Sequence, residues 1–286
     1  MYPARYFSLF PPYPRKPIAF VAMSFDQQFD ARWERVLKPA LEGIQRNGVN
    51  LTALRVDLGV ASDAILTEIL QHIGDASVIV ADISAVGDLG GRPIRNANVL
   101  YEVGLAHAAR LPEEVVLFRS DQLKLDFDVA GVRVHRYDPD NDEDTARRVV
   151  TETVLASLSA LNERARLSVR WATERLTQPA LFLLLELAPN GRAKHPQSAT
   201  FRDVVADTQR SNAIELLLEL GAVRSELVRF TPELLVEIRE NPSQSAQLLE
   251  YTTTAFGNSL ATHLMTEMGA FSSGVRELVE ELLQDV

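Results

Sequence analysis

The first half of the chain alternates short apolar runs with segments of helical periodicity. Mostly apolar runs predict five buried strands, at 17–22, 49–55, 76–83, 114–118 and 131–137. Between the runs, apolar residues recur at steps of three and four, which indicates amphipathic helices. Apolar strands separated by helices form a parallel sheet that is covered on both faces. We therefore predict an α/β fold, a doubly wound sheet of about five parallel strands.

The apolar periodicity also bounds the helices of this region. It predicts a helix from Phe29 to Ile44 that is kinked at Pro39 and closes at Asn47-Gly48. Further helices are expected over 65–73 and 99–109, with a glycine-containing loop at 87–93 before the second of them. An acidic turn at 138–144 then begins a long helix that runs to about Arg170.

From Gln178 onward, the pattern changes to helices separated by short polar breaks. We expect two domains, 1–172 and 173–286, the second mainly α-helical. A small hairpin at 222–230 would make this domain a winged helix. Its recognition helix, 211–220, carries Glu215 and Glu219 but no basic residue, which argues against DNA binding. The helices are expected at 180–187, 200–207, 211–220, 232–240, 243–268 and 274–284.

Composition removes several classes of function. The 286 residues carry a formal net charge of −10, which argues against a general binder of nucleic acids or anionic membranes. The absence of cysteine excludes disulfides, thiolate nucleophiles and cysteine-bound zinc. The most apolar run, 180–187, is too short to span a bilayer, and prolines interrupt the N-terminal apolar residues. We expect a soluble, cytoplasmic protein without membrane or DNA partners.

Known motifs exclude further chemistries. The chain has no P-loop, dinucleotide fingerprint, HExxH sequence or GxSxG elbow. Its five histidines lack the spacing of metal ligands. No metal and no cofactor are therefore expected.

One acidic residue stands out within the segment Asn96–His107. From Val99 to Ala109 every residue is apolar or uncharged except Glu102. A helix that is apolar all round is normally buried, and a buried carboxylate is costly unless it is paired or functional. Glu102 is accordingly the candidate nucleophile. The structural alternative is a helix-dipole interaction near the N-terminus, worth about 0.3–1 kcal/mol.

Other polar residues are expected to converge on Glu102, because ligands of doubly wound sheets bind beyond the carboxyl ends of the strands. Asp82 ends a buried strand and could position sugar hydroxyls or move a proton. Arg92, together with Arg95, could hold a phosphate. The remaining candidates for substrate binding are Met23, Ser24, Phe25, Asn96 and Asn98.

Each of these residues also has a structural interpretation. Asn98 would serve as the N-cap of the helix. Asp82 would terminate its strand, the two arginines would be solvated, and Ser24 and Phe25 would form an ordinary turn between strand and helix.

Several segments together resemble the nucleoside 2-deoxyribosyltransferase-like family, whose flavodoxin-like fold is close to that of Toll/interleukin-1 receptor (TIR) domains. The resemblance covers about residues 17–140, and its most specific piece is YEVGLAH at 101–107. It implies that Glu102 attacks or stabilises C1 of a ribosyl group while a base leaves. The transferases commonly have an aspartate at the position of Asn96. The segments are FVAMSF at 20–25, LKPA at 37–40, VIVADI at 78–83, NANVLYEVGLAH at 96–107 and VRVHRY at 132–137.

Three functional hypotheses follow. The first is an N-glycosidase or deoxyribosyltransferase acting on a nucleoside, nucleotide or NAD-like substrate. The two-domain architecture of this chain is similar to that of bacterial defence effectors that consume nucleotides. The second is a non-catalytic nucleotide-binding module coupled to the helical domain. The third is a scaffold that assembles into homo-oligomers, for which the helix at 275–283 is one candidate.

Overall fold

The computed structural model describes residues 15–46, 48–55, 62–123, 125, 132–190, 193–194, 201–227 and 249–270. The chain forms two compact units, Met1–Arg164 and Ala165–Val286. The division between them lies within one long helix, α6 (Glu143–Arg175), as does the division that we expected at 172/173.

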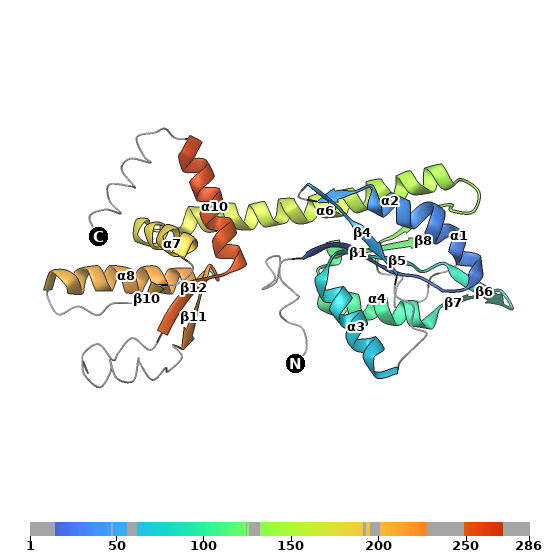
Figure 1. The fold of residues 1–286 in the computed structure, drawn as a ribbon, viewed down its shortest axis with the longest axis horizontal. Helices are drawn as coiled ribbons and strands as arrows, with labels where there is room; N and C mark the ends of the chain where they lie inside the picture. The colour runs from blue at the N-terminus through green and yellow to red at the C-terminus, as the bar shows by residue number, and fades with distance from the viewer. Residues whose placement is uncertain are drawn as a thin grey trace. The chain divides into compact units, whose positions relative to one another are not determined.

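The N-terminal unit is built on a five-stranded parallel sheet, as the apolar runs predict (Figure 1). The strand order is β4-β1-β5-β8-β9, with β1 and β5 paired through Ala19 and Val78. Every residue of β5 is buried, which explains its unbroken apolar run. The strands are β1 (Lys16–Ala22), β4 (Thr52–Leu54), β5 (Ala76–Asp82), β8 (Val115–Arg119) and β9 (Val134–Arg136).

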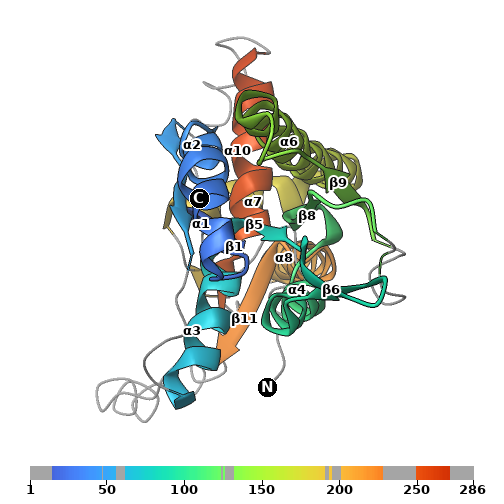
Figure 2. The same cartoon turned by 90° about the vertical axis from the view of Figure 1, so that its right-hand side faces the viewer.

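Helices cover both faces of this sheet. Val78 and Val80 belong to a hydrophobic cluster with α6 and with the helical segments that follow β1. Ile79 and Ala81, which alternate with them, pack against α3 (Ser62–Asp75) and α4 (Ala97–Ala109). Figures 1 and 2 show the two helical layers on opposite sides of the sheet. The fold is therefore doubly wound.

The helix predicted over 29–44 is interrupted and ends earlier than expected. A π-helical turn, η2 (Trp33–Leu37), stands immediately before Pro39, whose ring and missing N–H disfavour a regular α-turn. Helix α2 (Lys38–Glu42) ends at Glu42, and β2 (Gln45–Arg46) pairs with β3 (Val49–Asn50) across Gly48. The predicted strand 49–55 thus divides between β3 and β4. The segments before η2 are η1 (Gln27–Phe29) and α1 (Asp30–Arg32).

The glycine-containing loop that was predicted at 87–93 is a β-hairpin. Strands β6 (Ala85–Leu89) and β7 (Arg92–Arg95) are joined by Gly90 and Gly91. Their φ angles are +62° and +85°, and positive φ at both central residues is what a type I′ turn requires. The Gly-Gly pair was the sequence signal for this hairpin.

The C-terminal unit combines helices with a three-stranded antiparallel sheet of order β10-β12-β11. The two helices predicted at 200–207 and 211–220 are one helix, α8, and β12 replaces the start of the helix predicted at 243–268. The predicted helices at 232–240 and 274–284 lie outside the described residues. The elements are α7 (Gln178–Asn190), β10 (Ala193–Lys194), α8 (Phe201–Glu219), β11 (Val223–Leu227), β12 (Leu249–Thr253) and α10 (Ala255–Ala270).

Strand β11 occupies part of the hairpin predicted at 222–230, but its partner is the distant strand β12, paired through Val223 and Thr253. The winged-helix interpretation stays a prediction. Among the described helices, none has both the length and the apolar character needed to cross a bilayer.

A buried arginine joins the α3–α4 layer to the start of β8. Arg110, which follows α4, is fully buried, and its Nη2 lies 2.5 Å from Oε1 of Glu114. Its Nη1 donates to the carbonyl of Ile73 near the end of α3. Glu114 closes the short helix η3 (Pro112–Glu114) and also accepts from the backbone N–H of Leu111. The two charges are thereby paired inside the protein, although Nε of Arg110 is buried without a hydrogen-bond partner among the described residues.

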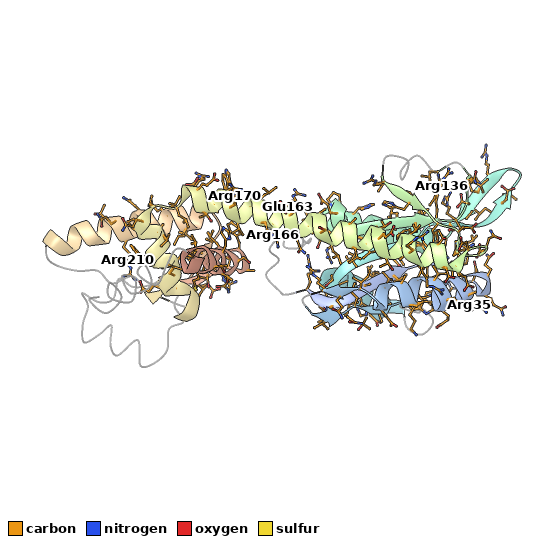
Figure 3. All side chains as sticks on the ribbon, turned by 90° about the horizontal axis from the view of Figure 1, so that it is seen from above. Arg35, Arg136, Glu163, Arg166, Arg170 and Arg210 are labelled. Carbon is orange, nitrogen blue, oxygen red and sulfur yellow. The ribbon has the colours of Figure 1, made fainter. Side chains whose placement is uncertain are left out.

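We expect Arg110→Ala to lower the free energy of unfolding of the N-terminal unit by about 3 kcal/mol, because the buried Glu114 would lose its nearest cation and keep only Arg15, at 3.7 Å. Arg35→Ala is the matched control, since Arg35 pairs with Glu143 at the surface (Figure 3). It should cost less than about 1 kcal/mol. Urea denaturation followed by Trp33 fluorescence in a Trp171→Phe background measures both. Equal losses in the two variants would contradict the role given to Arg110.

Candidate functional site

The helix that carries Glu102 begins at Asn96, not at Asn98. The side-chain Oδ1 of Asn96 accepts hydrogen bonds from the backbone N–H groups of Asn98 (3.0 Å) and Val99 (3.3 Å). Asn96 is therefore the N-cap of α4. The interpretation of Asn98 as the cap was wrong, because Asn98 lies within the first turn with its side chain exposed.

Glu102 is buried in the apolar helix, as the sequence suggests. It is 9% exposed and lies beside Val99, Val103 and Ala106, which pack against the sheet. Burial raises the pKa of Glu102 to about 7, because a desolvated carboxylate is less stable when charged. No hydrogen bond or ion pair connects this carboxylate to another described residue. A carboxylate in this state is near half-ionisation at neutral pH.

The structure links the start of α4 to the end of β1. Asn96 Nδ2 donates to Ser24 Oγ at 3.2 Å, and Ser24 Oγ donates to Asp26 Oδ2 at 3.0 Å. Ser24 itself is buried. Two of the predicted residues, Ser24 and Asn96, therefore meet at the carboxyl edge of the sheet, next to the helix of Glu102. Met23, by contrast, is part of the hydrophobic core on the α6 side of the sheet.

Arg55 holds the segment after β1 in place. Its guanidinium lies 4.0 Å from the ring centroid of Phe25, and its Nη2 donates to the carbonyl of Ser24 at 2.9 Å. It also approaches Asp30 at 3.4 Å. The Phe25 ring remains 42% exposed, which leaves part of its surface open to a ligand. Arg55 was missed in the sequence because only the strand order places β4 beside β1.

Asp82 is fully engaged in the protein interior. Its Oδ2 accepts from the Tyr137 hydroxyl at 2.7 Å and lies 3.5 Å from Nη1 of Arg32. Its Oδ1 accepts from the backbone N–H and the hydroxyl of Ser84. Burial and the neighbouring Asp82 raise the pKa of Tyr137 well above its usual value, so this phenol stays a donor. These bonds hold the ends of β5 and β9 together.

The alternation of side chains along β5 separates Asp82 from Glu102. Asp82 follows the parity of Val78 and Val80, which face α6, whereas Glu102 belongs to α4 on the other face. No described contact joins the two carboxylates, and Asp82 is bound instead to Tyr137 and Ser84. The role in a site expected for Asp82 stays a prediction.

Of the two arginines in the hairpin, one is structural and the other is exposed. Arg95 is buried and makes two hydrogen bonds, of 3.0 and 3.1 Å, to the carboxylate of Asp121. Burial opposes ionisation of Asp121, but the hydrogen bond and charge of Arg95, together with the backbone N–H groups of Ala85 and Leu123, outweigh that effect and lower its pKa. Arg92 lies beside the turn, paired with Leu89, and its side chain is exposed. Within the described parts of the chain, no group of three or more acidic or histidine side chains is placed to hold a metal ion.

No family model and no curated protein matches this chain. Among solved structures, it is similar to the metal-soaked Flv1 flavodiiron core from Synechocystis sp. PCC6803, with 20% sequence identity and a TM-score of 0.34. The match covers 50% of this chain and 36% of that one. A likeness at this level carries no information about function.

The buried carboxylate should make stability fall with pH. The pKa of Glu102 is raised in the folded protein. As pH rises, the unfolded chain therefore loses the Glu102 proton before the folded protein does, and the free energy of unfolding declines between about pH 4.5 and 7. We expect Glu102→Gln to raise the free energy of unfolding by about 2–3 kcal/mol at pH 8, with the difference vanishing near pH 4.5. Denaturation at both pH values tests this. Glu34→Gln, an exposed control, should change stability by less than about 0.5 kcal/mol.

The cap at Asn96 gives a second prediction. Asn96→Ala removes the acceptor for two backbone N–H groups and should cost about 1–2 kcal/mol of unfolding free energy. Asn96→Asp keeps the acceptor and places the residue typical of the transferases there, so it should retain most of the stability. Urea titration of both variants measures the difference. A loss in Asn96→Asp as large as in Asn96→Ala would show that the bond to Ser24, not the cap, is what matters.

Proposed function

We propose that this protein cleaves or transfers the N-glycosidic bond of a nucleoside, nucleotide or NAD-like molecule, with Glu102 as the nucleophile. The observation that carries the proposal is the Glu102 carboxylate, which is buried without a described partner. Its helix begins at the carboxyl edge of a doubly wound sheet, where ligands of such folds bind. The resemblance of residues 96–107 to the transferases' catalytic segment supports the same role.

The chemistry needs one carboxylate and little else from the protein. Glycosidic bonds break through a transition state with positive charge on the sugar, which an adjacent carboxylate stabilises. The Glu102 oxygen bonds to C1′ as the C1′–N bond breaks, and the base leaves with the electron pair. Water or an acceptor base then attacks C1′ and releases the carboxylate. Because the nucleophile must be ionised, activity should rise with pH through about 7.

The neighbouring residues suit a sugar and a base. Ser24 and Asn96 supply a hydroxyl and an amide at the start of α4, and these groups can bond sugar hydroxyls. The exposed part of the Phe25 ring offers a flat apolar surface to a base, since Arg55 covers its other part. In this proposal Asp82 is not a proton donor, because its oxygens are bound to Tyr137 and Ser84.

The hydrogen bonds that occupy the Asp82 carboxylate favour a second candidate function, a non-catalytic nucleotide-binding module. Among the described residues, no second carboxylate contacts Glu102, so a binding site without acid catalysis has support from the same geometry. In either case, the C-terminal unit would respond to occupancy. The finer expectations, a cytoplasmic, nucleotide-depleting defence effector that forms homo-oligomers, belong to the first candidate.

Release of a free base tests the proposal. The purified full chain is incubated with deoxynucleosides, their 5′-monophosphates and NAD, and the products are separated by chromatography. We expect base release from at least one substrate and a loss of about 1,000-fold or more in Glu102→Gln, because the amide cannot attack C1′. Glu34→Gln should keep full activity.

The other outcomes separate the candidates. Base release that persists in Glu102→Gln would exclude this residue as the nucleophile. No release, with thermal stabilisation by one nucleotide, would favour the binding module. A ligand at about 100 times its dissociation constant adds roughly 2.7 kcal/mol of stability. Assembly that depends on protein concentration, with no effect of any nucleotide, would favour the third hypothesis, a scaffold.

A further inference from the structure

A cavity lies on the α6 side of the sheet, away from α4 and Glu102. It has a volume of about 560 Å³, within the range of small-molecule sites. Its walls are β9 and one stripe of α6, and the segment that leads into β8 closes one end. Figure 2 shows α6 beside β8 and β9. All of its lining residues belong to the N-terminal unit.

The two walls of this cavity carry opposite charges. His135 lies on β9, and Arg133 immediately precedes this strand; both line the cavity. Glu152 and Thr153 lie on the facing stripe of α6. Burial and the nearby Arg133 lower the pKa of His135. Arg133 is the cationic side chain of the first wall, and Glu152 is the acidic side chain of the α6 wall. The other acidic residue of the lining, Glu113, is paired with Arg164.

These polar groups are available to a ligand. No hydrogen bond or ion pair connects the side chains of Arg133, His135, Glu152 or Thr153 to another described residue. The His135 ring is held in place instead by Phe118, with their centroids 5.8 Å apart. Arg133 and Glu152 both line the cavity, and no ion pair joins them. A ligand that carries both charges can bridge the gap between them.

Apart from Glu113, which is paired with Arg164, the rest of the lining is apolar or small. Val115 and Val116 contribute from β8, and Ala156 and Ala160 from α6. A few polar groups that converge over an apolar surface are the usual composition of a small-molecule site. The volume is large for an aliphatic amino acid and suits a bulkier body such as an aromatic ring.

We propose that this cavity binds a small zwitterion with a large apolar body, such as an aromatic α-amino acid. Its carboxylate pairs with Arg133, its ammonium group with Glu152, and its apolar body lies on Val116 and Ala156. Because α6 forms one wall and continues into the C-terminal unit, the bound molecule contacts the helix that both units share. This site is separate from the Glu102 site and does not depend on the function proposed for it.

Three related probes test the two charges separately. L-Tryptophan carries both charges, tryptamine lacks the carboxylate, and 3-indolepropionate lacks the ammonium group. Isothermal titration of the full chain should show L-tryptophan binding at least about fivefold more tightly than either analogue, the upper range for a half-exposed ion pair. Equal affinity for the three probes, or no saturable binding of L-tryptophan at millimolar concentration, would overturn the proposal.

Variants assign each charge to its wall. Arg133→Gln should weaken L-tryptophan about fivefold and leave tryptamine unchanged, because only the carboxylate loses its partner. Glu152→Gln should weaken L-tryptophan equally and leave 3-indolepropionate unchanged. Ala156→Leu should weaken binding of all three probes, because the larger side chain occupies part of the cavity. Since Arg133 and Glu152 are exposed, we expect both charge variants to fold.

Two control variants change the same charges outside the cavity. Arg136 lies on β9 with the opposite parity, and Glu163 lies further along α6 (Figure 3). Neither lines the cavity. Arg136→Gln and Glu163→Gln should therefore leave the affinity for L-tryptophan unchanged. A loss of affinity as large as in Arg133→Gln or Glu152→Gln would show that binding depends on general charge attraction, and it would overturn the proposal.

Discussion

The burial of β5 on both faces is the constraint on which the N-terminal unit depends. All seven residues of this central strand, Ala76–Asp82, are buried, so each side chain must fit one of two helical layers. Val78 and Val80 pack with α6, whereas Ile79 and Ala81 pack with α3 and α4. This alternation separates Asp82 from Glu102. Asp82 and Glu102, which the sequence led us to expect in one site, therefore lie in different layers.

Buried charge distinguishes structural residues from the candidate nucleophile. Five charged residues are buried in the described parts of the chain: Asp82, Arg95, Glu102, Arg110 and Glu114. Four of them bind an oppositely charged or hydrogen-bonding partner. Glu102 alone has none among the described residues, and its raised pKa reflects that cost. A protein tolerates such a group where a ligand or a reaction uses it, which is the reason for placing the site there.

The same sheet offers two sites of different character. At the carboxyl edge, Ser24 and Asn96 form a polar corner at the start of the helix of Glu102, and Arg55 fixes its neighbouring loop. On the α6 side, the cavity beside β9 is lined by Arg133, Glu152 and apolar residues. We propose a sugar with its base for the first and a zwitterion for the second. Helix α6 lines only the second.

The sequence by itself determined the parallel doubly wound sheet and the burial of Glu102, because apolar runs and helical periodicity are local patterns. Local patterns also mark the Gly-Gly turn of the β6–β7 hairpin. The tertiary structure decided which residues meet. The pairing of β11 with β12 joins segments more than twenty residues apart, and the contact between Arg55 and Ser24 depends on β4 lying beside β1. The separation of Asp82 from Glu102 likewise follows from strand parity and the side on which each helix packs, which no local pattern records.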